Sequence, residues 1–279
     1  MKHLLTGVEG VVENLPDHVY HSDVETLSST GARKILHSPA LFRHEQDHPA
    51  AYSPTFNLGH AAHTMVLSAG AAIEQIDADN YRTKDARHLR EEALAEGKTP
   101  LLPREYEQVT DMYQACLDHP VVGKLIERDA LVREASMFWV DETTGAACRA
   151  RPDLATADWS LLIDYKTTVD ASPVGFAKAL GNLWYHCQQS WYQDAVEHFT
   201  GISPMFVFIA QEKTPPYQVG IYELDPVAVE IAQAMNHKAR TIWKTCMETG
   251  EWPGYTPNPV TIALPAWAER SLSEEYIDD

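Results

Sequence analysis

The segment from residue 135 to 168 constrains the fold more than any other part of this chain. Residues 135–140 and 147–152 flank a polar turn that contains a glycine, a pattern that predicts a β-hairpin. Residues 159–166 have the apolar centre Leu161-Leu162-Ile163 and predict a third strand. Three strands in succession indicate that a sheet forms the centre of the fold.

Asp164 and Lys166 stand at the end of that third strand, and Asp153 ends the hairpin strand before it. Residues two apart on a strand point to the same face. Two carboxylates at one point repel each other unless a cation joins them, and oxygen ligands favour Mg²⁺ or Mn²⁺. Such a metal activates a water and stabilises charge on a phosphodiester, and a neighbouring lysine can orient that water or assist its deprotonation. The pattern therefore predicts metal-assisted phosphodiester hydrolysis by Asp153, Asp164 and Lys166.

A charged surface hairpin is the alternative, because an Asp-x-Lys triplet often occurs by chance. Two features argue against it: the triplet follows an apolar strand, and Asp153 ends the neighbouring one. Glu134, at the start of the first hairpin strand, is a candidate third carboxylate. An ordinary charge at a strand edge explains Glu134 equally well.

The first half of the chain has mostly helical patterns. Serine and threonine caps begin two short helices, and apolar periodicity indicates three more. The expected helices cover residues 28–36, 38–44, 57–67, 105–117 and 121–128. Residues 71–100 are polar and weakly periodic, so we expect a mobile segment or loop there.

The second half is expected to contain further helices and two more strands. The helices cover residues 173–180 and 184–199, the strands residues 205–210 and 218–223, and a final helix runs from Asp225-Pro226 to about Gly250. The acidic tail is expected to be frayed.

These elements predict a single α/β domain over residues 1–279. It would comprise a mainly helical portion at 1–130, a sheet core with the catalytic motifs and a closing helix at 131–250, and a tail at 251–279.

Composition limits the partners and the location of the protein. The net charge of -18 argues against a uniformly basic DNA-binding surface, so only a cleft can attract phosphate. The four cysteines are widely spaced, which argues against a zinc or iron–sulfur site. We find neither a signal-peptide core nor an apolar run that could span a bilayer, so we expect a cytoplasmic protein with no membrane partner.

Asp153 with Asp164-Tyr165-Lys166 resembles the PD-(D/E)XK nuclease signature, with Asp as the middle acid. The short motifs around it, over residues 20–210, resemble those of a narrower group. This group is the phage and prophage recombination exonucleases of the exonuclease VIII (RecE-like) type. The matching words are Tyr20-His21, Leu27-Ser28-Ser29, Ser38-Pro39-Ala40, Gly59-His60-Ala61-Ala62-His63, Met112, His119-Pro120, Glu134, Gly145, Cys148-Arg149-Ala150-Arg151-Pro152-Asp153, Asp164-Tyr165-Lys166-Thr167-Thr168, and Tyr185-His186-Cys187-Gln188 with Tyr192. The resemblance implies a restriction-endonuclease-like core, a mixed central sheet flanked by helices, with a helical N-terminal portion.

The resemblance also implies roles for residues outside the acidic motif. His63 would join Asp153, Asp164 and Glu134 on the metal; from the residues alone, a histidine on an apolar helix is more often a satisfied core residue, and His60 stays with that interpretation. Gln188 and Tyr192 share a helix face and would touch the substrate or position the lysine. The alternative for that pair is a buried tyrosine with an amide neighbour.

Five basic residues are candidate DNA contacts. Arg149 and Arg151 share a strand face that ends at Asp153, and a guanidinium binds phosphate bidentately; a salt bridge to Glu134 or Asp141 is the alternative. Arg82, Lys84 and Arg87 form a basic group, for which a solvated helix face is the alternative.

By resemblance, the protein would resect the 5′ strand of linear double-stranded DNA and leave a 3′ tail for recombination. The resemblance implies a bacterial host cell, a single-strand annealing partner protein and a ring-shaped homo-oligomer, perhaps a tetramer. The alternatives are a structure-specific endonuclease or a CRISPR-adaptation-type end trimmer on the same core, and a non-catalytic DNA-end-binding protein.

Overall fold

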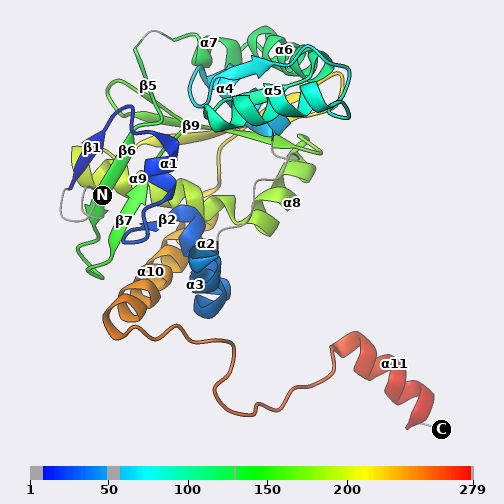
Figure 1. Ribbon diagram of the computed structural model, residues 1–279. Coiled ribbons are helices and arrows are strands. Elements are labelled where there is room, and N and C mark those ends of the chain that lie inside the picture. The colour runs from blue at the N-terminus through cyan, green and yellow to red at the C-terminus, as the bar shows by residue number, and fades with distance from the viewer. Residues whose placement is uncertain (1–8, 49–56, 129, 278–279) are drawn as a thin grey trace.

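The computed structural model describes residues 9–48, 57–128 and 130–277, and its strands form three sheets (Figure 1). A five-stranded sheet has the order β11-β10-β9-β8-β5, a four-stranded sheet the order β1-β6-β7-β2, and β3 pairs with β4. The strands are β1 Gly10–Val12, β2 Leu27–Ser28, β3 Ile73–Gln75, β4 Thr99–Leu101, β5 Leu131–Arg133, β6 Ser136–Val140, β7 Ala147–Ala150, β8 Leu154–Thr156, β9 Leu161–Thr168, β10 Met205–Glu212 and β11 Val219–Tyr222.

The five-stranded sheet is mixed and is covered on both faces. β9 runs parallel to β10 and antiparallel to β8, and β11 is antiparallel to β10. Leu162 on β9 packs with one apolar core and Ile163 with the other, because successive side chains point to opposite faces. The expected fold class, a mixed central sheet flanked by helices, is confirmed.

Helices supply the two covering layers (Figure 1). Residues of α4 and α6 share one core with the sheet, and residues of α2, α9 and α10 share the other. The helices are α1 Asp17–His21, α2 Ser29–His37, α3 Pro39–Asp47, α4 Asn57–Leu67, α5 Lys84–Ala95, α6 Pro103–Asp118, α7 Val122–Ile126, α8 Pro173–Leu183, α9 Tyr185–Thr200, α10 Pro226–Thr249 and α11 Ala266–Tyr276. Among the described residues, no helix is long and apolar enough to cross a membrane.

The helix-capping residues in the sequence predicted the positions of several helices correctly. The Ser28 and Ser38 hydroxyls accept hydrogen bonds from the backbone N–H groups of Gly31 and Leu41 at the starts of α2 and α3. Asp225 caps α10 in the same way, and Gly250 ends it with a left-handed φ of 72°. A capping hydrogen bond lies within three residues of its helix, so sequence patterns can predict it.

The expectation of a loop at residues 71–100 is wrong. That segment contains β3, α5 and β4, and Thr83 caps α5 by accepting a hydrogen bond from the N–H of Ala86. α5 buries Ala86 and Ala93. Two small alanines among charged residues give only a weak apolar stripe. The apolar periodicity of the sequence therefore did not predict this helix.

The hairpin β6–β7 is confirmed, but its place beside β9 is not. The two hairpin strands belong to the four-stranded sheet, and the missed strand β8 pairs with β9 instead, through Leu154 opposite Ile163. Asp153 therefore does not end a hairpin strand. It lies in the short link where the chain passes from one sheet to the other.

The tail also differs from the frayed end that was expected. Residues 251–265 form neither a helix nor a strand and have bends at residues 255, 257 and 258, and α11 follows at residues 266–276 (Figure 1). The last two residues, at which the acidic tail ends, lie outside the described part of the chain.

Candidate active site

Asp164 and Lys166 lie together on β9, as their spacing predicted. Lys166 Nζ forms an ion pair with Asp164 Oδ1 and lies 5.1 Å from the centre of the Tyr185 ring. The Asp164 side chain is only 1% exposed, whereas that of Lys166 reaches the cavity described below. Asp164 thus needs partners that keep a buried carboxylate hydrogen-bonded.

Gln188 and Tyr192 on α9 supply those partners. Gln188 Nε2 donates to Asp164 Oδ2 at 2.9 Å and to the Tyr192 hydroxyl at 3.0 Å. The pair shares a helix face, as expected. Gln188 contacts the acid of the motif and not its lysine, and Tyr192 lines the cavity.

Asp153 reaches the same place from the link between the sheets. Its Oδ2 accepts a hydrogen bond from the backbone N–H of Tyr165 at 2.8 Å. Tyr165 stands between Asp164 and Lys166 in the sequence, so this bond holds the Asp153 carboxylate next to the Asp-Tyr-Lys segment. His63 on α4 approaches the same oxygen, with Nε2 at 3.2 Å. A contact between residues 63 and 153 joins two distant segments, and no local pattern predicts it.

Glu134 faces the other nitrogen of His63. The distance from Glu134 Oε1 to His63 Nδ1 is 3.8 Å. Glu134 precedes β6 with a left-handed φ of 46°, and its N–H donates to the carbonyl of Asp153 at 3.0 Å. This backbone contact ties the two acidic segments together, and the Glu134 side chain lines the cavity described below.

Burial and crowding of charge perturb the titration of these groups. Burial raises the pKa of Asp164 to about 6, against the opposing effect of Lys166. Burial also raises the pKa of Glu134. For His63 and Lys166 burial acts to lower the pKa, but the neighbouring carboxylates outweigh it and raise both. Perturbed groups gathered in one cleft are typical of a functional site.

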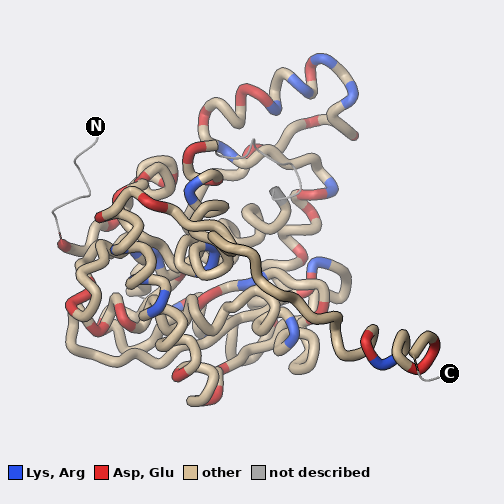
Figure 2. The backbone as a smooth tube through the Cα atoms, turned by 90° about the horizontal axis from the view of Figure 1, so that it is seen from below, with Lys and Arg blue, Asp and Glu red and all other residues tan. Residues whose placement is uncertain are grey.

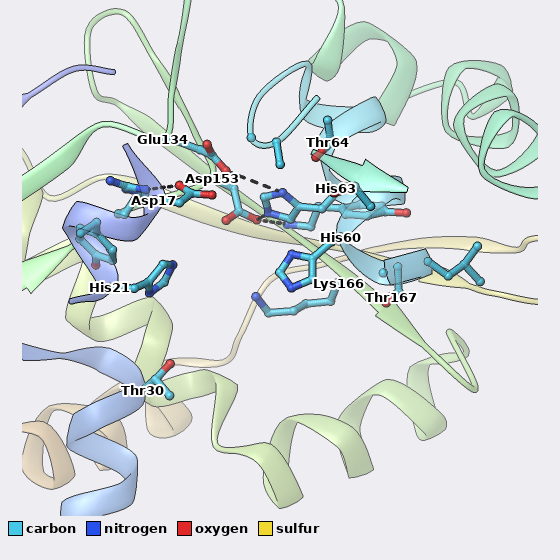
Figure 3. A pocket seen from close by; sticks show the side chains of 18 of the residues that line it. Asp17, His21, Thr30, His60, His63, Thr64, Glu134, Asp153, Lys166 and Thr167 are labelled. Atoms are coloured by element: carbon cyan, nitrogen blue, oxygen red, sulfur yellow. Dashed lines mark hydrogen bonds and ion pairs between the residues drawn. The ribbon is translucent and has the colours of Figure 1, made fainter. Parts of the chain in front are cut away.

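These groups border a cavity of about 1170 Å³ (Figure 3). Its wall includes His63, Glu134, Asp153, Lys166 and Tyr192, while Asp164 lies just behind it. The volume exceeds the roughly 300–1,000 Å³ of usual small-molecule pockets. The cavity is therefore larger than a usual small-molecule pocket.

Sequence reasoning missed other residues of this wall. Asp17 and His21 on α1, Thr30 on α2 and His60 on α4 also line the cavity (Figure 3). His60 is exposed, so its interpretation as a core residue was wrong. Its position one helical turn from His63 was the available signal.

The donor set has the chemistry of a site for a divalent cation. Carboxylates and an imidazole suit Mn²⁺, and carboxylates suit Mg²⁺. Asp164 Oδ1 is a buried carboxylate oxygen whose partner is Lys166 Nζ in the ion pair described above. In the described ranges, no three His, Cys, Asp or Glu side chains are already gathered in a cage that could hold an ion. His63, Glu134 and Asp153 lie together on the cavity wall, and these donors fit a divalent cation.

Both arginines of β7 and its link are held by acids near the N-terminus. Arg149 donates to the Thr26 hydroxyl at 3.0 Å and lies 3.8 Å from Asp23. Arg151 pairs with Asp17 at 2.6 Å and lines the cavity. The acids Glu134 and Asp141, considered from the sequence, are not these partners.

Arg82, Lys84 and Arg87 lie outside the cavity wall. All three are exposed at the start of α5 or just before it. Figure 2 shows basic and acidic positions intermixed along the backbone. Their exposure agrees with the alternative of a solvated helix face.

The fold and the site together define a protein of the PDDEXK-like class, which indicates a hydrolytic nuclease. The chain belongs to the family described as PDDEXK-like domain of unknown function (DUF3799), which matches residues 28–259. This supports the broad nuclease superfamily and not the RecE type in particular.

One solved structure has the same fold. A candidate exonuclease from Eubacterium rectale has a TM-score of 0.62 and 12% identity, and the match covers 95% of this chain and 99% of that one. A phage-related exonuclease from Haemophilus somnus 129PT has a TM-score of 0.36 and 10% identity over 81% of this chain and 96% of that one. Among curated proteins, none matches the sequence.

Proposed function

We propose that this protein is a Mg²⁺- or Mn²⁺-dependent exodeoxyribonuclease that acts on the ends of linear double-stranded DNA. The observation that carries the proposal is the meeting of Asp153, His63, Glu134 and Lys166 on one cavity, with Asp164 directly behind Lys166. Metal ligands and a lysine at one point are the minimal equipment for phosphodiester hydrolysis.

Each residue has a distinct role in this proposal. Asp153, Asp164 and His63 would hold the metal, with Glu134 as a fourth ligand or as the group that orients His63. A bound metal supplies an activated water and neutralises charge on the phosphate. The carboxylates raise the pKa of Lys166, so it is charged at neutral pH and donates hydrogen bonds to the water or the phosphate. Gln188 holds Asp164, and Tyr192 borders the substrate.

The direction and the biological role extend this proposal. We propose removal of the 5′ strand to leave 3′ single-stranded tails for recombination, with a single-strand annealing protein as partner. A ring of subunits would hold DNA by enclosure, which suits a chain with a net charge of -18. The support for these points is the sequence resemblance alone.

Digestion of end-labelled duplexes tests the proposal. Linear duplex with Mg²⁺ should be shortened from its 5′ ends, EDTA should stop the reaction, and a covalently closed plasmid should survive. Loss of label from the 3′ end first would refute the direction. Cleavage of the closed plasmid would identify a structure-specific endonuclease instead.

A non-catalytic DNA-end-binding protein is the second candidate. The observation in its favour is that Lys166 forms an ion pair with Asp164, whose side chain has almost no exposed surface. Under this alternative, duplex ends bind but remain intact with either Mg²⁺ or Mn²⁺. Comparison of wild type with Asp164→Asn separates the two: only a nuclease loses activity in the variant.

A further inference from the structure

The wall of the cavity also includes the turn between β10 and β11. Lys213 and Thr214 in this turn line the cavity together with Gln108 of α6, and Lys166 and Thr167 line it from the end of β9 (Figure 3). Lys213 is half-buried and Thr214 is exposed. Both side chains carry hydrogen-bond donors, so the turn adds donors to the cavity that holds the candidate catalytic groups.

The pairing of β9 with β10 fixes how far this turn lies from Lys166. The two strands are parallel, Ala210 lies opposite Lys166, and Lys213 follows three residues after Ala210. A strand advances about 3.3 Å per residue and neighbouring strands lie about 4.8 Å apart, so the backbone of Lys213 is roughly 11 Å from that of Lys166. Phosphates of one DNA strand are spaced about 3.4 Å along the duplex axis. A strand whose scissile phosphate lies at Lys166 therefore brings another phosphate, about three positions away or fewer, to Lys213.

Hydrogen bonds hold the backbone of the turn in place. Gln108 Nε2 donates to the carbonyl of Lys213 at 2.7 Å, and the N–H of Tyr217 donates to the carbonyl of Thr214 at 2.8 Å. The N–H of Glu212 donates to the carbonyl of Gln218 at 2.9 Å. Because the backbone is already ordered, a ligand that binds at Lys213 has to order only the lysine side chain.

Lys213 differs from the other basic residues of the cavity wall in its partners. The Lys and Arg residues of this wall are Arg151, Lys166 and Lys213. Asp17 pairs with Arg151 and Asp164 pairs with Lys166, whereas no ion pair within the described part of the chain includes Lys213. A polyanion gains little from the rest of a chain with a net charge of -18. The ammonium group of Lys213 is therefore available to an anionic ligand.

We propose that Lys213 binds a phosphate of the DNA strand that lies in the cavity, and that the Thr214 hydroxyl donates to the same phosphate. This inference rests on the proposed function, since it takes DNA as the ligand of the cavity. Lysine binds phosphate as a point charge, and a phosphate contact positions a strand without reading its sequence. Such a contact suits an enzyme that moves from one nucleotide to the next. The phosphate is either the terminal one or one within the strand.

A cycle of double changes tests the contact by binding in Ca²⁺, without cleavage. The ligand is a linear duplex in which a methylphosphonate removes the charge of one phosphate, at each of the first linkages of either strand in turn. Lys213→Gln should weaken binding about three- to tenfold, the scale of one net hydrogen bond. One neutral linkage should weaken binding of the wild type by a similar factor and should have no further effect on Lys213→Gln. Duplexes with a 5′-phosphate or a 5′-hydroxyl test the terminal phosphate in the same way.

Two other variants are the controls. Lys178 is exposed on α8 and lies outside the cavity wall, so Lys178→Gln removes the same charge elsewhere. It should bind as the wild type does and keep the sensitivity to the neutral linkage. Lys213→Arg retains the charge and should retain most of the affinity. Circular dichroism checks that all variants fold, which is expected because the Lys213 contact with Gln108 uses only its backbone.

The pattern of losses decides the outcome. Coupling of Lys213 to the terminal phosphate places it beside the leaving nucleotide, and coupling to an inner linkage places it beside the remaining strand. Losses that simply add at every phosphate, or equal weakening by Lys178→Gln and Lys213→Gln, would overturn the inference. With Mg²⁺, Lys213→Gln should raise KM by the factor seen in binding and leave kcat nearly unchanged. A lower kcat at unchanged KM would also overturn it.

Failure of this inference can be told from failure of the proposed function. A wild type that cleaves duplex but shows only additive losses would refute the Lys213 contact alone. A wild type that shows the coupling in Ca²⁺ but cleaves nothing with Mg²⁺ or Mn²⁺ would refute the nuclease activity and retain the contact. A wild type that binds no duplex would refute both.

Discussion

Substitution of Gln188 by leucine tests how the buried acid of the site is held. Gln188 makes two hydrogen bonds with its amide group, to Asp164 at 2.9 Å and to Tyr192 at 3.0 Å. Leucine has nearly the same size but no donor. Gln188→Leu therefore leaves a carboxylate oxygen and a hydroxyl without this partner.

The expected loss of stability follows from these two bonds. A hydrogen bond to a charged group contributes about 1.5–3 kcal/mol, and a neutral one about 0.5–1.5 kcal/mol. Gln188→Leu should lower the free energy of unfolding by about 2–4 kcal/mol at pH 8. Turnover on linear duplex should fall, because Asp164 is no longer fixed.

The loss should depend on pH. Burial raises the pKa of Asp164 to about 6, above the value of about 3.9 for a free aspartate. The contribution of this group to stability is therefore present below about pH 4 and is lost as pH rises to about 6. The amide of Gln188 stabilises the ionised carboxylate, which predominates above that range. The difference between wild type and variant should therefore be larger at pH 8 than at pH 5.

Gln189 provides a matched control one residue away. It is also buried, but its Oε1 has no hydrogen-bond partner among the described residues. Gln189→Leu should change stability little, or increase it, because an unsatisfied polar atom is removed. Urea unfolding in EDTA measures both variants. Equal stability of the two would refute the role assigned to Gln188.

Three further predictions concern the proposed chemistry and DNA binding. Asp153→Asn should abolish cleavage with Mg²⁺ while the circular dichroism spectrum stays native, and near-normal turnover would contradict its role as a ligand. Lys166→Ala should lower the rate on the order of 10²-fold, with DNA binding in Ca²⁺ largely retained; binding that falls with the rate would make it an electrostatic anchor. Neutralising Arg82, Lys84 and Arg87 together should reduce the salt slope of binding by about 0.9 for each lost phosphate contact, whereas an unchanged slope would assign them to a solvated helix face.

The sequence by itself determined the features that depend on neighbours along the chain. Asp164 and Lys166 share a strand face because side chains alternate with period two. The caps at Ser28, Ser38 and Asp225 placed three helices, because a cap acts within its own first turn.

Only the tertiary structure decided which distant segments meet. It inserted β8 beside β9, brought His63 to Asp153 across 90 positions of sequence, and placed Gln188 against Asp164. It also paired Arg149 and Arg151 with acids near the N-terminus that the hairpin pattern did not suggest. The physical reason is that such contacts depend on how whole layers pack, and the free energy of packing is shared among residues far apart in the chain. A local pattern contains none of that information.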